Sequence, residues 1–69
     1  MKDNLDLAAS AQELADGAPA GSVRRAAASS VAITLATTRD ADHARTTLDG
    51  LSPDEVRRAA LDLFDDLTK

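Results

Sequence analysis

The stretch that decides the fold reads Gly50-Leu51-Ser52-Pro53-Asp54-Glu55-Val56. Ser52 is typical of a helix N-cap, whose hydroxyl accepts the amide of Glu55 while the Glu55 side chain returns to the Ser52 amide. Pro53 suits the first helical position, where a missing N–H costs nothing. We expect Leu51 and Val56 to form a hydrophobic staple at this start. The pattern predicts a last helix over residues 53–67.

A first helix is predicted over about residues 5–15, where apolar side chains recur on one face. Asp3 or Asn4 can cap its start, and Gly17 is a natural left-handed stop. The following loop is expected to cover residues 16–22, because two glycines and a proline within seven residues interrupt any helix.

A second helix is predicted over residues 22–38, with Ser22 as its cap. Its side chains are small or apolar almost all the way round, which is typical of a central helix. Residues 31–38 also alternate like a strand, but the chain offers no second strand to pair with. The helix either continues to residue 48 or ends where Asp40 caps a short third helix. The fold class is therefore all-α, a compact bundle of three helices, or of four.

The chain is small for an independent domain. Its 69 residues form one domain, with no cysteine and with Phe64 as the one aromatic residue. Alanine contributes little apolar area. The free energy gained by burial therefore nearly equals the free energy lost by ordering the chain, and the net free energy of folding is close to zero. Self-association is the simplest way to bury more surface, and we expect a homodimer.

Composition limits the partners and the compartment. The net charge is −4, whereas nucleic-acid-binding proteins usually carry a basic patch. No signal peptide follows Met1, and no apolar run is long enough to span a bilayer. We expect a cytoplasmic protein with no membrane partner.

Catalytic and metal-binding signals are weak. Asp40 and His43 are spaced to face one ion, but a zinc site needs three or four ligands, so a solvent-facing histidine is favoured. Ser29 and Ser30 have no base at a helical spacing, and no glycine-rich phosphate loop is present. The sequence therefore predicts no enzyme, no cofactor and no metal site.

Five side chains are candidate contacts with a protein partner. Leu61 lies outside the apolar arc of the last helix, and Phe64 is the lone aromatic residue. Arg24 and Arg25 have no acidic residue within one turn of their helix. The candidates are Leu61, Phe64, Arg24, Arg25 and Arg57. The arginines belong to a five-residue segment that occurs twice, which we call the echo. Val23-Arg24-Arg25-Ala26-Ala27 recurs as Val56-Arg57-Arg58-Ala59-Ala60. Shared composition at helix starts is the simpler explanation, and duplication stays open.

These observations favour a small regulatory or adaptor protein that acts through helix-mediated contacts with itself and with a protein partner. The alternative is a helix-turn-helix-like DNA-binding regulator that uses residues 41–67. Its recognition helix would present Asp54 and Glu55 to the phosphates, which disfavours nucleic acid as the partner.

Overall fold

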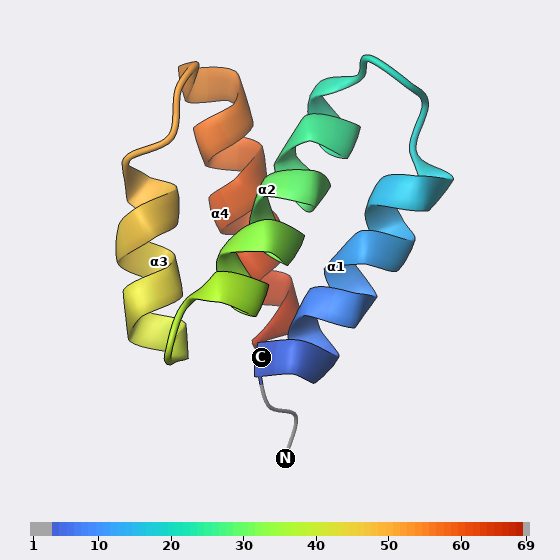
Figure 1. Cartoon of the computed structure of the whole chain (residues 1–69). Helices are drawn as coiled ribbons and strands as arrows, with labels where there is room; N and C mark the ends of the chain where they lie inside the picture. The colour runs from blue at the N-terminus through green and yellow to red at the C-terminus, as the bar shows by residue number, and fades with distance from the viewer. Residues whose placement is uncertain (1–3, 69) are drawn as a thin grey trace.

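The computed structural model describes residues 4–68, except for the side chain of Ala41. Four helices fill this part of the chain, namely α1 (Asn4–Gly17), α2 (Val23–Thr37), α3 (Ala41–Asp49) and α4 (Asp54–Leu67). No strand occurs within it, so the all-α prediction is confirmed, with four helices rather than three. Successive helices run in alternating directions, with α1 and α3 at the two sides and α4 behind α2 (Figure 1).

α2 is the central helix, as predicted, because it packs against each of the other three. Its buried side chains are Ala27, Ala28, Val31, Ala32, Thr34 and Leu35. The strand alternative for residues 31–38 is wrong, since the helix continues to Thr37. The threonines at the end of this segment bond back one turn through their hydroxyls. The Thr37 hydroxyl donates to the Ile33 carbonyl at 2.8 Å, and the Thr38 hydroxyl donates to the Thr34 carbonyl at 2.7 Å.

The chain breaks between α2 and α3 instead of continuing as one helix. Asp40 adopts an extended conformation, and its carboxylate accepts the amide of His43 at 2.8 Å, which caps α3. The side-chain amide of Asn4 donates to the Thr38 carbonyl at 3.3 Å and so ties the start of α1 to the end of α2. Asp3, the other predicted cap of the first helix, lies outside the described residues.

The start of α4 differs from the predicted one. Pro53, with φ −72° and ψ 171°, is the N-cap residue, and no side chain caps this helix. The Pro53 carbonyl accepts the amides of Val56 and Arg57, each at 3.1 Å. Because the extended ψ of Pro53 places it just before the helix, Ser52 lies one position too early to act as a cap. The predicted capping box between Ser52 and Glu55 is therefore wrong.

The loop between α1 and α2 is shorter than predicted. α1 includes Gly17, and among the described residues Gly21, at φ +82°, is the one with a positive φ. The left-handed glycine is thus Gly21 and not Gly17. Ser22 caps α2 as predicted, because its hydroxyl accepts the amide of Arg25 at 3.1 Å. The same hydroxyl donates to the Pro19 carbonyl at 2.7 Å and closes the turn.

The core joins all four helices and depends heavily on alanine. Each helix contributes one alanine with no exposed surface, namely Ala11, Ala28, Ala44 and Ala60. The largest fully buried side chains are Leu35, Leu48 and Val31. The predicted apolar face of α4 packs against this core, as does Leu51. The radius of gyration is 10.6 Å, close to the value of about 11 Å for a folded chain of this length.

The two helical hairpins correspond position by position. Residues 4–36 align with residues 37–69 without a gap, and nine of the pairs are identical, including Gly17 with Gly50 and the whole five-residue echo. Among the aligned pairs whose side chains the structure describes on both sides, four are buried in both halves, namely Ala11 with Ala44, Ala15 with Leu48, Ala27 with Ala60, and Val31 with Phe64. The matching residues therefore extend beyond the five-residue echo into the preceding helix of each hairpin.

Candidate functional site

Two of the predicted contact residues belong to the monomer core. Phe64 is only 3% exposed, and Leu61 is half-buried and packs against the core. Leu61 lies outside the apolar arc of α4, yet it is partly buried, and α3 also packs against α4. Asp65 lies one turn beyond Leu61 on the same side and pairs with Arg45 of α3. This hydrogen bond, together with the charge of Asp65, raises the pKa of Arg45.

The three predicted arginines have different surroundings. The Arg25 guanidinium donates to the Ala18 carbonyl at 3.4 Å and holds the turn before α2. Arg57 is half-buried, and its Nη2 lies 3.2 Å from Oδ1 of Asp54. Arg24 is exposed, and it has no ion pair or hydrogen-bond partner within residues 4–68. Of the three, Arg24 is the one whose charge is available to a partner.

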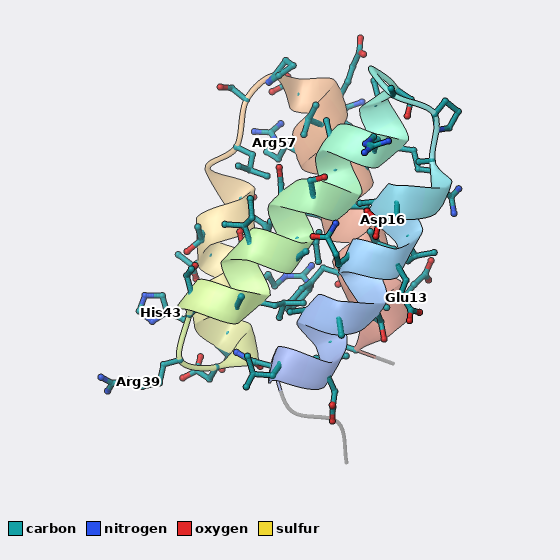
Figure 2. The ribbon with its side chains drawn as sticks, turned by 45° about the vertical axis from the view of Figure 1, so that its right-hand side comes forward. Glu13, Asp16, Arg39, His43 and Arg57 are labelled. Atoms are coloured by element: carbon teal, nitrogen blue, oxygen red, sulfur yellow. The ribbon has the colours of Figure 1, made fainter. Side chains whose placement is uncertain are left out.

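The histidine lies at the surface of α3. Figure 2 shows His43 and Arg39 projecting away from the helices at the junction of α2 and α3. The Asp40 carboxylate beside His43 already accepts a backbone amide. Among the described residues, no group of three His, Cys, Asp or Glu side chains could hold a metal ion.

An open groove lies between α1, α2 and α4. Its volume is about 370 Å³. Its lining consists of three alanines, three larger apolar side chains and three charged side chains. In that order the lining residues are Ala27, Ala28 and Ala59; Leu14, Val23 and Leu63; and Arg24, Asp62 and Asp66. Leu14 and Leu63 are both half-buried where they line the groove. The sequence does not predict this groove, because it depends on how helices distant in the chain are placed.

A second feature is the outer face of α2, which we define as Ala26, Ser29, Ser30, Ile33, Ala36 and Thr37. In Figure 1, no other helix lies in front of α2. Ile33 is 64% exposed at its centre, and the two serines are half-buried. Residues 26–38 include no charged side chain. This face is therefore apolar or weakly polar along its whole length.

Within residues 4–68, no helix is both long and apolar enough to cross a bilayer. Comparisons of the chain with protein-family models, with curated proteins and with solved structures found no match.

Proposed function

We propose that this protein is a small, non-enzymatic helical interaction module with a regulatory or adaptor role, and that it associates with a second copy of itself through the outer face of α2. The observation that carries the proposal is the exposure of Ile33, at 64%, in the middle of a helix that is otherwise central to the fold. Together with the uncharged side chains around it on the outer face of α2, Ile33 forms a contiguous exposed patch, and such patches are typical of interaction surfaces.

Charge supports a second copy as the occupant of this face. The chain has a net charge of −4, so two copies repel each other through their acidic surfaces. The outer face of α2 has no charge between residues 26 and 38, and two copies can meet there without bringing like charges together. Its small side chains also allow a close approach between two helices.

The expected dimer is weak. Burying one isoleucine on each copy contributes about 1.5–3 kcal/mol per side chain. Association costs about 4–15 kcal/mol in lost freedom of motion, and the flanking small residues add little apolar area. We therefore expect a weak, reversible dimer with a dissociation constant of about 1 mM.

Sedimentation velocity across a dilution series from about 1 μM to about 1 mM tests the proposal. The wild type should shift from monomer to dimer as its concentration rises, and Ile33→Asp should stay monomeric. Leu5→Asp is the matched control, because Leu5 is also exposed, at 68%, and acquires the same charge on α1. Far-UV circular dichroism verifies that all three chains stay helical.

Two results would contradict the proposal. One is a wild type that stays monomeric over the whole series, and the other is an Ile33→Asp variant that dimerises as the wild type does.

The helix-turn-helix alternative has less support. The first turn of α4 carries Asp54 and Glu55, both exposed, and Asp54 already pairs with Arg57. A recognition helix with this start would bring negative charge to the DNA backbone. A gel-shift assay below about 100 mM salt distinguishes the two functions, and we expect no shifted DNA.

A further inference from the structure

The shortest helix, α3, has little intrinsic stability. It has nine residues, whereas each of the other helices has 14 or 15. An isolated helix of this length is unstable in water, so α3 depends on its contacts with α2 and α4. Its sequence does not compensate, because four of its residues have low helix propensity, namely Asp42, Thr46, Thr47 and Asp49.

Two side chains anchor α3 in the core. Ala44 and Leu48 have no exposed surface, and they lie one turn apart on the same side of the helix. The other side chains of α3 that the structure describes are all exposed, namely Asp42, His43, Arg45, Thr46, Thr47 and Asp49. Leu48 is among the largest fully buried side chains, so the attachment of α3 depends mainly on this leucine.

Charge adds little to this attachment. Arg45 pairs with Asp65 of α4, but both side chains are about half exposed, and surface ion pairs of this kind contribute little to stability. The last turn of α3 has no basic residue and ends with Asp49, although the helix dipole disfavours a negative charge there. The C-terminal end of α3 is therefore poorly stabilised by its own charges.

The other three helices have a core of their own. α2 packs against both α1 and α4, and α1 also contacts α4, whereas α3 lies at one side of the molecule (Figure 1). Without Ala44 and Leu48, the buried cluster still contains Leu7, Ala8, Ala11, Ala27, Val31, Ala32, Leu35, Ala60 and Phe64. Most of the core therefore remains in place when α3 leaves it.

We infer that α3 is a detachable lid. It unfolds and leaves the bundle in a local opening reaction, while α1, α2 and α4 stay packed together. The opening exposes the apolar surface of α2 and α4 against which α3 packs. Local opening is concentrated in the parts of a protein that have few buried apolar contacts and many exposed residues, and α3 has both properties. The lid thus controls access to a second apolar surface, in addition to the outer face of α2.

The inference goes beyond the proposed dimer and does not rest on it. At a protein concentration of about 0.1 mM, which is below the dissociation constant expected for the dimer, most of the chains are monomeric. An experiment at this concentration reports on the single chain, so a failure of self-association and a failure of lid opening are separate results.

The experiment is amide hydrogen exchange of the ¹⁵N-labelled protein followed by NMR, under conditions where the exchange rate is proportional to the population of the open state. After correction for intrinsic rates, the amides of residues 45–49 in α3 should exchange at least about tenfold faster than those of Val31, Ala32 and Leu35 in α2. Low concentrations of urea should accelerate the α3 amides less steeply, because a local opening exposes less surface than complete unfolding does.

Two variants that remove helix caps test whether α3 opens on its own. Ser22→Ala removes the cap of α2 and should accelerate exchange of the α2 amides by about 2- to 30-fold. It should leave the α3 amides unchanged, because α2 stays folded when α3 opens. Asp40→Ala removes the cap of α3 and should accelerate exchange in both helices, because α3 is unfolded in the local and in the global open state.

Gly17→Ala tests the same point with the opposite sign. The substitution should stabilise α1, because Gly17 is helical and a Cβ there meets nothing within 4 Å. Exchange of the α2 amides should become slower, and exchange of the α3 amides should not change. This variant keeps the experiment decisive even if Ser22→Ala fails to fold.

Three results would overturn the inference. The first is exchange of the α3 amides that is as slow as that of the α2 amides, and the second is an equal dependence of both on urea. The third is a change of the α3 amides in Ser22→Ala or Gly17→Ala by the same factor as the α2 amides. Each of these results would show that α3 unfolds only together with the whole protein.

Discussion

Two serines that precede helices should respond differently to the same substitution. Ser22 accepts the amide of Arg25 at 3.1 Å and donates to the Pro19 carbonyl at 2.7 Å. Removing this cap should lower the free energy of unfolding by about 0.5–2 kcal/mol. Ser52 lies outside α4 and makes no capping bond, so Ser52→Ala should change that free energy by less than about 0.5 kcal/mol.

The difference is large for a chain of this size. A 69-residue domain has a total stability of about 3–10 kcal/mol, so the loss of one cap removes a substantial fraction. A change of 1 kcal/mol also lowers the melting temperature of a small domain by about 4–8 °C. Ser22→Ala should therefore melt several degrees below the wild type, and Ser52→Ala should melt with it.

Urea unfolding followed by far-UV circular dichroism measures both variants, since the chain has neither tryptophan nor tyrosine. Asp40→Ala serves as a positive control for the loss of a cap, because the Asp40 carboxylate accepts the amide of His43 at 2.8 Å at the start of α3. If Ser52→Ala loses as much stability as Ser22→Ala, then Ser52 caps α4 and the assignment of Pro53 as the N-cap is refuted.

Three further predictions concern the turn, the core and the surface. Gly21→Ala should destabilise the protein by about 1–2 kcal/mol, because Gly21 has φ +82°. Gly17→Ala should instead stabilise it by up to about 1 kcal/mol, since Gly17 is helical and a Cβ there meets nothing within 4 Å. Thermal melts should show a lower melting temperature for Gly21→Ala and a higher one for Gly17→Ala. Leu48→Ala should cost about 2–5 kcal/mol because Leu48 is fully buried, whereas Leu5→Ala, at an exposed position, should cost less than about 0.5 kcal/mol in the same urea series. Asp65→Asn, which breaks the ion pair to α3, should leave the melting temperature unchanged at about 0.15 M salt, because both partners are about half exposed and salt screens them; a clear loss would show that this ion pair holds α3 in place.

Local signals in the sequence predicted most of the fold. Ser22 and Asp40 each cap a helix in the structure, because a short polar side chain before a helical stretch has few other local partners. The absence of a partner strand correctly favoured a helix over residues 31–38. The start of α4 was missed by one residue, since Ser52 and Pro53 both suit a helix start and the backbone of Pro53 decides between them.

The candidate site was harder to predict, because it depends on where the helices sit relative to one another. A helical wheel of α4 cannot show that Leu61, which lies outside the apolar arc, is half-buried and packs against the core. It also cannot show that Leu14 and Leu63, from helices distant in sequence, leave a groove above Ala28.

The four alanines without exposed surface, one on each helix, limit how this protein can change. A methyl group is the smallest side chain that still fills space, so these positions set a minimum separation between the helices. Any larger residue there would push a neighbouring helix outward and strain the packing. Greater stability must therefore come from the periphery, through better helix ends and surface residues, rather than from a bulkier interior.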